Sequence, residues 1–425
     1  MVHEKSRSAA KKMQDLQNEL SMQAVTDSTY NDSLQFFQHF FRTHPAAFSL
    51  PENQDDFFDG LFAEMEKCCS NNAVVHILHY GDSQIEEDRI TGIFRQRMQE
   101  RFGGNGAGLL PAVQLIPSAA VGHSASENIK RYVVSGLHRN RATHNRYGVL
   151  GQVAQLNGTG TVSFAANNYG RTFDNTKQWS RVRVFVGQHS KNFSATLQAK
   201  NLKQKQTIDS QNAQYAVLSW QTDTLKKVSL NFSGNAELLG IALESPCGVF
   251  VDNIPLRGSA GTFFTQIDKN SIEFMLNALN VKLIILQFGG NMMPQINSQK
   301  NIDKYMETFV AQIRHFQSIF PQAKILVTGP ADMSKKVRGR LQTYPFLPEL
   351  VEKMQLTANQ NGAAFWNMFA VMGGNGSMID WVKEKPTLAA PDYIHFTPRG
   401  ANKMGEMLFD AMMKYYDFYK FNKHK

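Results

Sequence analysis

A short apolar run that ends in a glycine turn constrains this chain more than any other stretch. Residues 74–80 (VVHILHY) are mostly apolar, which is typical of a buried strand. Residues 81–83 (GDS) give a turn signal, and apolar residues then recur at helical spacing as far as Phe102. Acidic residues at 86–88 would suit the positive end of a helix dipole. We therefore predict a strand, a tight turn at Ser83 and a helix that begins directly after it.

Ser83 has two interpretations at this point. A serine on a strand-to-helix turn, beside free amides of a helix N-terminus, can act as a nucleophile whose oxyanion those amides stabilise. Ser and Asp are also preferred capping residues, so the same triplet could serve only as a helix cap. The triplet alone favours the cap, and the rest of the chain has to decide.

Strand and helix patterns alternate on both sides of this stretch. Apolar residues have helical spacing at residues 34–41, 55–69, 271–279, 302–316, 347–361 and 398–415, and strand patterns occur at residues 281–288, 323–328 and 363–366. This alternation predicts a parallel sheet covered by helices on both faces. In such sheets the functional groups gather at the carboxyl ends of the strands.

The middle of the chain has a different pattern. Between about residue 126 and residue 253 helical spacing disappears, and short alternating runs rich in Val, Thr, Phe and Ser take its place. Turn residues separate these runs at intervals close to those of a β-sandwich. We predict an inserted all-β domain with strands at 160–164, 181–186, 193–197, 215–220 and 227–232, and with its last strands at 238–244 and 248–252.

The length of 425 residues predicts two or three domains. We assign residues 1–30 to a polar lead that is helical or partly disordered, residues 31–124 and 254–425 to a discontinuous α/β domain, and residues 125–253 to the β domain. No stretch reaches the ~20 apolar residues of a membrane span. Residues 1–22 lack the apolar core of a signal peptide, although a chain whose signal peptide has been removed would look the same.

The charge of the chain does not indicate a nucleic-acid partner. The formal net charge is +9, from 45 basic and 36 acidic residues, and such an excess helps a protein approach an anionic polymer. The basic residues are scattered, however, and no nucleic-acid-binding module is recognisable. The one local cluster, residues 414–425, is interpreted as a final helix with a frayed basic end. We expect no nucleic-acid partner.

The cysteines and histidines do not form a metal motif. Cys68 and Cys69 are neighbours and lack metal-ligand spacing, and a disulfide from Cys247 to either of them stays open. Cysteine usage therefore leaves the redox compartment open. His76 and His79 are three apart on the predicted strand, so they face opposite sides and favour packing over a zinc site. We expect neither a metal nor a cofactor.

Three predicted strand ends or helix starts carry groups that suit acyl transfer. Ser83 follows one strand, residues 289–291 (GGN) follow another, and Asp392 and His395 precede the last helix. A serine esterase needs a nucleophile, a base, a carboxylate that orients the base, and donors for the oxyanion, which Asn291 could supply. Each group alone could be a turn, a cap or a surface side chain. Together they occupy the positions where an α/β sheet gathers its chemistry.

These residues resemble the SGNH hydrolases, the GDSL-like esterases and lipases, whose four sequence blocks carry Ser, Gly, Asn and His in that order. Ser83 matches the nucleophile of the first block, with Gln84 where the usual pattern has Leu. Residues 258–261 (GSAG) match the Gly-x-x-Gly pattern of the second block. Gly261 fits the oxyanion glycine best, and Gly258 is the alternative.

The third and fourth blocks match as well. Asn291 closes a Gly-x-Asn pattern, although Met292 replaces the frequent following Asp. Asp392 and His395 match the Asp-x-x-His block with the family's spacing. The resemblance implies an oxyanion hole formed by Asn291 and Gly261, and a catalytic triad of Ser83, Asp392 and His395.

A β domain between the first and second blocks resembles bacterial peptidoglycan O-acetylesterases, in which a sandwich like a carbohydrate-binding module interrupts the hydrolase. Residues 79–89 and 103–106 are also similar to that branch, and the glycine-rich residues 103–108 are interpreted as a flexible loop near the site. The resemblance covers residues 74–108 and 252–412. It implies a flavodoxin-like three-layer α/β hydrolase domain with a parallel sheet, and a jelly-roll insertion.

The resemblance implies a serine esterase that removes O-acetyl groups from peptidoglycan or another glycan through an acetyl-enzyme intermediate. We expect such a protein to be exported and to act in the periplasm or outside the cell. An O-acetyltransferase with the same triad, in which a sugar hydroxyl replaces water, is the first alternative. A non-catalytic glycan-binding protein is the second, and the intact site residues argue against it. Sugar binding by the β domain rests on analogy alone.

Overall fold

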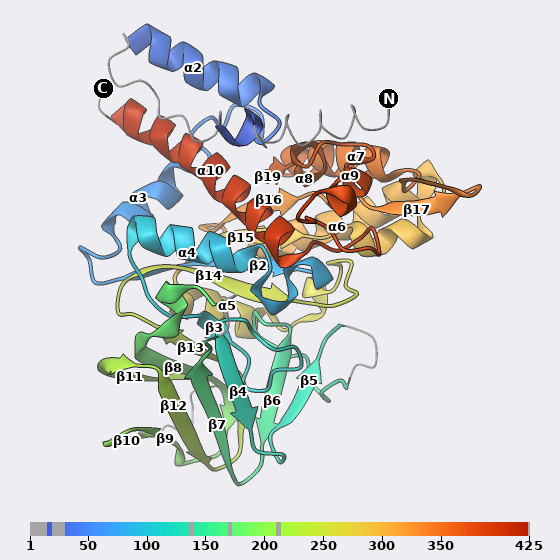
Figure 1. Ribbon diagram of the computed structural model, residues 1–425. Helices are drawn as coiled ribbons and strands as arrows, with labels where there is room; N and C mark the ends of the chain where they lie inside the picture. The colour runs from blue at the N-terminus through green and yellow to red at the C-terminus, as the bar shows by residue number, and fades with distance from the viewer. Residues whose placement is uncertain (1–14, 19–29, 136–139, 169–171, 210–213, 424–425) are drawn as a thin grey trace.

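The computed structural model describes residues 15–18, 30–135, 140–168, 172–209 and 214–423 (Figure 1). Most of the predicted polar lead, residues 1–30, therefore lies outside the described residues. Its described residues 15–18 are helical. Helix α2 (Tyr30–Thr43) confirms the helix expected at 34–41. Its apolar face packs on the C-terminal helix α10 (Pro398–Lys423), where Phe41 stacks on Tyr415 at a ring distance of 4.4 Å.

A mainly parallel sheet forms the centre of the α/β portion. Its strand order is β14-β2-β15-β16-β19, with β1 (Phe48–Ser49) added antiparallel at the β19 edge. The first strand of the chain order thus lies between the second and the third, which is the flavodoxin-like arrangement. The flavodoxin-like α/β prediction is confirmed by these strands: β2 (Val74–Gly81), β14 (Gly248–Pro255), β15 (Val281–Gln287), β16 (Lys324–Thr328) and β19 (Ala364–Trp366).

Helices cover both faces of this sheet, because its strands alternate two apolar faces. Val75 and Ile77 of β2 pack among the helices of one face, and Leu78 and Tyr80 pack on the other. The first face carries α10 with α3 (Asp59–Lys67), α4 (Thr91–Phe102), α8 (Met368–Val371) and α9 (Ser377–Lys383). The second carries α5 (Lys269–Leu279), α6 (Gln299–Ile319) and α7 (Leu347–Gln360).

The segment after β2 differs from the predicted helix. Residues Ser83–Asp88 form a 3-10 segment, η1, with non-helical backbone at Glu86 and Glu87, and the α-helix begins only at Thr91. Two of the acidic side chains here pair with cations, Glu86 with Arg257 at 2.6 Å and Asp88 with Arg95 at 2.9 Å. The prediction of a helix directly after Ser83 is therefore wrong.

The inserted domain is a sandwich of two antiparallel sheets around one apolar core. One sheet has the order β10-β9-β12-β7-β4, and the other has the order β11-β8-β13-β6-β5, with β3 paired to β13. The strands are β3 (Gly108–Leu110), β4 (Val121–Ala125), β5 (Lys130–Val133), β6 (Gln152–Leu156), β7 (Thr159–Ala166), β8 (Trp179–His189), β9 (Phe193–Ala199), β10 (Leu202–Ile208), β11 (Ala216–Leu225), β12 (Lys227–Ser233) and β13 (Ala236–Glu244).

Strand pairing corrects both predicted boundaries of this insertion. The expected last β-domain strand, 248–252, is part of β14, which pairs in parallel with β2 from Gly248 opposite Val74. Its Val-Phe-Val run suits a strand buried in either kind of sheet, so the pattern alone did not assign it. At the other end, β3 and β4 belong to the sandwich although they precede residue 126.

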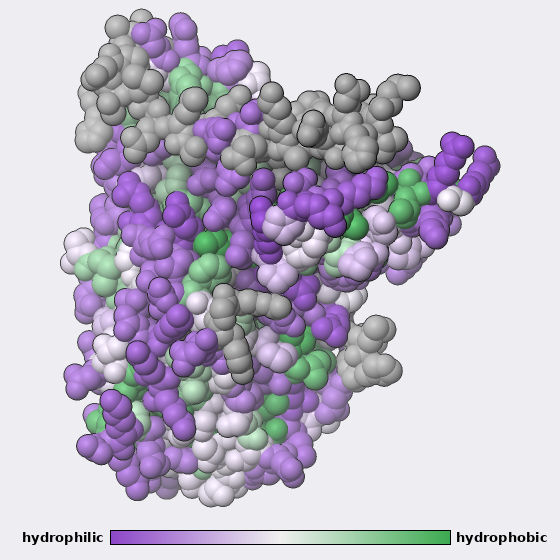
Figure 2. Space-filling view, viewed as in Figure 1, coloured by the Kyte–Doolittle hydropathy of each residue, from purple (hydrophilic) through white to green (hydrophobic). Residues whose placement is uncertain are grey.

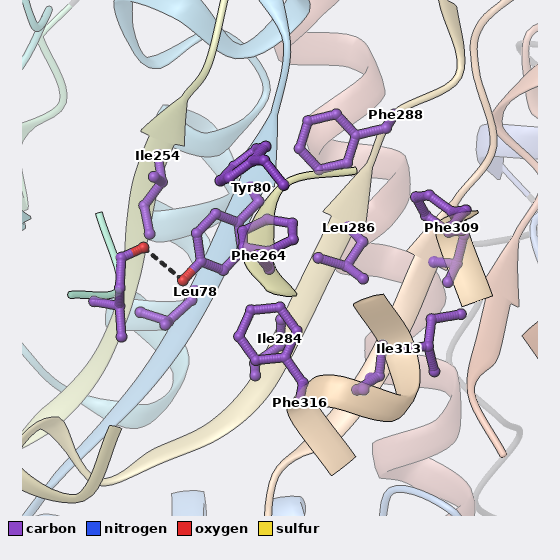
Figure 3. Close-up of a cluster of buried hydrophobic side chains, with 14 of the residues drawn as sticks. Leu78, Tyr80, Ile254, Phe264, Ile284, Leu286, Phe288, Phe309, Ile313 and Phe316 are labelled. Atoms are coloured by element: carbon purple, nitrogen blue, oxygen red, sulfur yellow. Dashed lines mark hydrogen bonds between the residues drawn. The ribbon is translucent and has the colours of Figure 1, made fainter. Parts of the chain in front are cut away.

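The sandwich packs directly on the parallel sheet, below it in Figure 1. Tyr80 of β2 donates its hydroxyl to the carbonyl of Val149, the connection marked by the dashed line in Figure 3, at 2.7 Å. Phe185 of β8 belongs to the same apolar cluster as Phe264 and Phe316, which surround Tyr80. The two parts therefore share a core across their junction.

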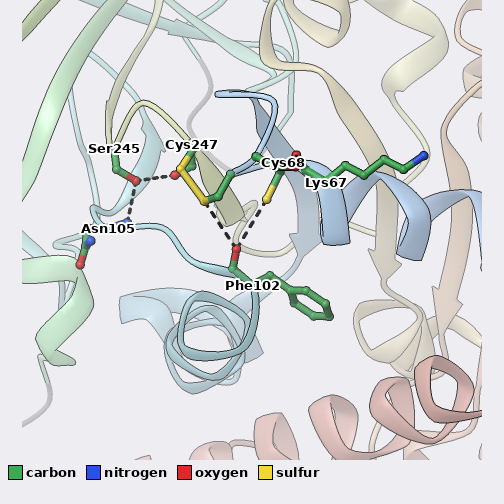
Figure 4. Close-up of a disulfide and its surroundings, with 8 residues drawn as sticks. Lys67, Cys68, Phe102, Asn105, Ser245 and Cys247 are labelled. Carbon is green, nitrogen blue, oxygen red and sulfur yellow. Dashed lines mark hydrogen bonds between the residues drawn. A yellow bond between two sulfur atoms is a disulfide. The ribbon is translucent and has the colours of Figure 1, made fainter. Parts of the chain in front are cut away.

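A disulfide and a close backbone contact connect the chain at the amino ends of strands β2 and β14. Cys69 pairs with Cys247, directly before β14, and Cys68 stays a free buried thiol (Figure 4). The glycine-rich residues 103–108 pass here, where a Cβ on Gly248 would lie 2.4 Å from the Gly104 Cα. These glycines allow backbones to touch. The loop that begins at Gly103 therefore lies at the amino ends of the strands, whereas Ser83 lies at their carboxyl ends. The expectation of a flexible loop near the site is wrong.

The C-terminal helix extends further than predicted. Helix α10 continues to Lys423, and Lys420 and Lys423 both pair with Glu66 of α3, at 3.1 and 2.9 Å. The basic end is therefore held by an acidic partner rather than frayed. Hydrophilic residues predominate on the face in Figure 2, with small separate hydrophobic patches. Within the described ranges, no helix combines the length and apolar character that a bilayer crossing requires.

Candidate active site

Ser83, His395 and Asp392 lie in one hydrogen-bonded line at the carboxyl end of the sheet. The Ser83 Oγ lies 2.8 Å from His395 Nε2, and His395 Nδ1 lies 2.7 Å from Asp392 Oδ2. Ser83 follows β2, and Asn291 follows β15, so the group sits where the strand order reverses. The structure thus brings the three predicted triad residues together, although Ser83 and His395 are 312 positions apart in the sequence.

The loop before α10 is shaped by its own aspartate. Asp392 Oδ1 accepts the backbone N–H groups of Ile394 and His395, at 2.9 and 3.0 Å, which leaves Oδ2 for the imidazole. Tyr393 takes a left-handed conformation, with φ of 59°, to close this turn. Burial acts to raise the pKa of Asp392, but these hydrogen bonds, led by that from the His395 ring, outweigh it and lower the pKa.

Gln84 also holds this loop, a role that the sequence patterns did not suggest. Its Nε2 donates to the carbonyl of Ile394 at 2.5 Å, and its Oε1 accepts the N–H of Phe396 at 3.3 Å. The two bonds reach the backbone on both sides of His395. The available signal was the glutamine itself, which stands where the SGNH pattern usually has leucine.

Asn291 lies beside the nucleophile, and both of its amide hydrogens are engaged. Nδ2 donates to Asp82 Oδ2 at 3.0 Å and to the carbonyl of Ser259 at 3.1 Å. Asp82 also accepts the N–H of Gln84 at 3.0 Å. Burial raises the pKa of Asp82 to about 6, against the lowering effect of Gln84, His395 and Asn291.

Neither glycine of the second block borders the hollow that Ser83 lines. Gly261 donates its N–H to Ser259 Oγ at 3.1 Å, and a Cβ at this position would lie 2.4 Å from the Phe288 ring. The packing of Phe288 therefore explains this glycine. Gly258 is exposed, with open space around the position of its missing Cβ. An oxyanion contact from Gly261 requires the N–H to exchange partners.

The hollow beside Ser83 is lined by both polar and apolar side chains. It encloses about 720 Å³, part of it open to solvent. The polar lining includes Ser83, Asn291 and His395, and the apolar or aromatic lining includes Pro330, Met333, Tyr344, Met368 and Ile394. Met333 and Tyr344 flank a hairpin of β17 (Ser334–Val337) and β18 (Arg340–Thr343). Such a hollow has room for a small acyl group next to the serine.

Comparison with known proteins gives a fold. No protein-family model matches, and no curated protein matches. Among solved structures, a peptidoglycan O-acetylesterase matches with a TM-score of 0.66 and 23% identity, over 82% of this chain and 94% of that one. The fold is that of an SGNH hydrolase with an added β domain.

Two further esterases match over smaller parts of the chain. The carbohydrate acetylesterase Est24 from Sinorhizobium meliloti matches with a TM-score of 0.27 and 15% identity, over 39% of this chain and 78% of that one. The acetyl xylan esterase AlAXEase matches with a TM-score of 0.28 and 13% identity, over 38% of this chain and 81% of that one.

The histidines of β2 in this SGNH fold have structural partners. His76 Nδ1 lies 2.6 Å from Asp252 Oδ2, and its Nε2 lies 3.1 Å from Glu244 Oε2. Glu244 Oε2 also accepts a hydrogen bond from Arg183 Nη2. This buried network, which sequence patterns did not indicate, joins the sandwich to the sheet. His79 lies 2.9 Å from Gln287 Oε1, and burial lowers its pKa to about 4. In the described part of the chain, no three metal-binding side chains come together.

Proposed function

We propose that this protein is a serine esterase that removes O-acetyl groups from a carbohydrate polymer. The observation that carries the proposal is the line Ser83–His395–Asp392, with distances of 2.8 and 2.7 Å, beside an open hollow. The low pKa of Asp392 keeps it ionised at neutral pH, so it accepts the Nδ1 hydrogen of His395. His395 Nε2 is then free to act as the base.

The first step transfers the acetyl group to the enzyme. Ser83 Oγ attacks the acetyl carbonyl carbon while His395 Nε2 takes its proton, which gives a tetrahedral oxyanion. The bond between the carbonyl carbon and the sugar oxygen then breaks, and His395 returns the proton to that oxygen. The products are a free sugar hydroxyl and an acetyl-Ser83 ester.

The second step releases acetate. A water molecule attacks the acetyl-Ser83 carbonyl while His395 takes its proton, and collapse of the intermediate returns that proton to Ser83 Oγ. In the alternative O-acetyltransferase reaction, a second sugar hydroxyl attacks in place of water. Access of that hydroxyl to the hollow would decide between the two outcomes.

Asn291 and Gly261 are the proposed oxyanion donors. The Asn291 amide now bonds Asp82 and Ser259, and the Gly261 N–H bonds Ser259. To bind the oxyanion, each donor would have to give up one of the hydrogen bonds that it makes in this structure. Both donors have Ser259 as a partner. Loss of the Asn291 amide in Asn291→Ala should lower kcat by about 10²–10³-fold, as expected for one oxyanion donor.

The proposed substrate and compartment follow from the broad structural match and the disulfide. The matching structure is described as a peptidoglycan O-acetylesterase, and we propose an acetylated glycan, peptidoglycan or another, for this chain too. We also propose that it works in the periplasm or outside the cell. The Cys69–Cys247 bond supports this placement, because disulfides persist in oxidising compartments.

The test is hydrolysis of p-nitrophenyl acetate by the wild type, by Ser83→Ala and by Ser124→Ala, an exposed serine of β4. We expect activity in the wild type and in Ser124→Ala, and its loss in Ser83→Ala. Acetate release from O-acetylated peptidoglycan and from acetylated xylan would name the polymer. A folded wild type without turnover on any ester would contradict the esterase and favour a glycan-binding protein.

A further inference from the structure

The hairpin of β17 and β18 projects from the α/β portion beside the hollow that Ser83 lines. Figure 1 shows it extending away from the neighbouring helices, and the same projection is mostly hydrophilic in Figure 2. The residues that flank it in the chain, Met333 and Tyr344, both line the hollow. The chain therefore leaves the wall of the hollow, forms the hairpin and returns to the same wall.

The base of this hairpin is bonded to the loop that carries His395. The backbone N–H of Ser334 donates to the carbonyl of Tyr393, two residues before His395, at 2.9 Å. Thr343, which pairs with Ser334 across the hairpin, donates its hydroxyl to the buried Asp332 at 2.8 Å. These bonds give the base of the hairpin a defined place next to the triad.

The hairpin is strongly basic. Residues 333–348 contain no acidic side chain and four basic ones, Lys335, Lys336, Arg338 and Arg340. The last three are exposed, and Lys335 is partly buried. In the part of the chain that the structure describes, none of the four forms an ion pair with a carboxylate. Cations grouped in this way without counter-charges attract anionic ligands.

The turn of the hairpin carries an arginine where the backbone favours other residues. Val337 pairs with Arg340, so Arg338 and Gly339 form a two-residue turn, with φ of 49° and 81°. Turns of this kind favour Asn or Asp before Gly, because a positive φ strains larger side chains. Local folding therefore does not explain Arg338, whereas a positive charge that binds a partner at the tip would explain it.

Lys335 brings the positive charge of the hairpin to the border of the hollow. Its Nζ lies 4.6 Å from the centroid of the Tyr344 ring, which is a cation–π contact, and Tyr344 lines the hollow. From Lys335 to Arg338 the extended chain spans about 10 Å. A small ester occupies the hollow alone, whereas a polymer held there is long enough to contact the hairpin as well.

We propose that this hairpin binds the carboxylate groups of a peptidoglycan strand whose O-acetylated sugar occupies the hollow. The lactyl and peptide carboxylates of that polymer are complementary in charge to the four cations. Arg338 and Arg340 can each hold a carboxylate through two parallel hydrogen bonds. The inference rests on the proposed function and narrows its substrate to an anionic glycan, since chitin and unsubstituted xylan carry no carboxylates.

Binding is measured on the full chain carrying Ser83→Ala, by isothermal titration calorimetry with soluble peptidoglycan strands. The nucleophile is absent, so a failure of this inference is distinguishable from a failure of the esterase proposal. The matched ligand is the same preparation with its carboxylates converted to amides. We expect the native strands to bind about tenfold more tightly at low ionic strength, and high salt to reduce this preference by screening. Equal affinity for the two preparations would overturn the proposal.

A triple substitution locates the binding on the hairpin. In Lys336→Gln/Arg338→Gln/Arg340→Gln all three positions are exposed, so the fold should persist, as the melting temperature checks. Affinity for the native strands should fall about tenfold, as expected for the loss of three exposed charge contacts. Unchanged affinity would exclude the hairpin.

A matched control removes the same charge elsewhere. Lys67→Gln/Lys203→Gln/Lys227→Gln changes three exposed lysines on α3, β10 and β12, and we expect this variant to bind the native strands like the Ser83→Ala parent. An equal loss of affinity in both triple variants would show an effect of net charge and overturn the proposal.

Two further measurements separate binding of the polymer from other roles of the hairpin. With Ser83 intact, the hairpin triple variant should raise KM for acetate release from O-acetylated peptidoglycan about tenfold, with kcat within about twofold of the wild type. A fall in kcat at constant KM would contradict a docking role. Binding to vesicles of phosphatidylglycerol and phosphatidylcholine that depends on the hairpin, without such binding to peptidoglycan, would overturn the proposal in favour of a membrane surface.

Discussion

The side chain of Gln84 holds the backbone on both sides of His395. One bond runs from Gln84 Nε2 to the Ile394 carbonyl, at 2.5 Å, and the other runs from the Phe396 N–H to Gln84 Oε1, at 3.3 Å. Gln84 is also the residue next to Ser83, so one short segment carries the nucleophile and positions its base. We expect this connection to help maintain the distance of 2.8 Å between Ser83 Oγ and His395 Nε2.

Replacing Gln84 by the leucine of the usual family pattern should slow the reaction. Gln84→Leu removes both bonds to the histidine loop, and we expect kcat on p-nitrophenyl acetate to fall about tenfold, the equivalent of one to two net hydrogen bonds. KM should change little, because the side chain positions the base. Steady-state kinetics with a melting-temperature control checks this, and an unchanged kcat would exclude the positioning role.

Asp392→Asn should lower activity much more while leaving the fold intact. Asparagine can still accept the N–H groups of Ile394 and His395, so the turn should persist. It loses the charge that stabilises protonated His395, and we expect kcat to fall by about 10³–10⁴-fold. Circular dichroism and kcat measured together separate the role of Asp392 in shaping the turn from its role in stabilising protonated His395. A loss below tenfold would show that Asp392 only shapes the turn.

The buried network at the domain junction should make stability depend on acid. Burial acts to raise the pKa of Glu244, but Arg183, His76 and Arg181 outweigh it and lower the pKa to about 2. Since this folded-state pKa lies below the ~4.3 of an unfolded glutamate, the stabilisation is complete above that pH and is lost as pH falls towards 2.

Glu244→Gln tests this dependence by urea unfolding between pH 3 and pH 7. Removing one partner of a buried ion pair should lower the free energy of unfolding by about 3–5 kcal/mol at pH 7, with a smaller difference from the wild type at pH 3. Glu352→Gln, exposed on α7, should stay within about 0.5 kcal/mol. Equal losses at both pH values would contradict the assigned ionisation.

The disulfide should stabilise the return of the chain from the sandwich to β14. It closes a sequence separation of 178 residues, and replacing both cysteines in Cys69→Ser/Cys247→Ser should lower the free energy of unfolding by about 2–5 kcal/mol. Reductant should destabilise the wild type but not the double variant. Thiol counting under denaturing conditions without reductant should find only Cys68, and three reactive thiols would contradict the pairing.

Features fixed by neighbours in the chain could be predicted from the sequence. The apolar run of β2, its turn at Ser83, and the Asp392–His395 spacing each depend on a few adjacent residues, and each is present in the structure. The alternation of strands and helices similarly predicted a parallel sheet. Such patterns report which faces are buried, and this requires no knowledge of the partner.

The tertiary structure decided which distant groups meet. Residues 248–252 have the same pattern in a sandwich or a parallel sheet, and only pairing with β2 assigns them. The partners of Gln84, Asn291 and Gly261 likewise lie far away or depend on a local turn, so no spacing rule predicts that Asn291 bonds Asp82 or that Gln84 holds the His395 loop. Hydrogen bonds and strand pairing depend on positions in space, whereas periodicity encodes only burial along one segment.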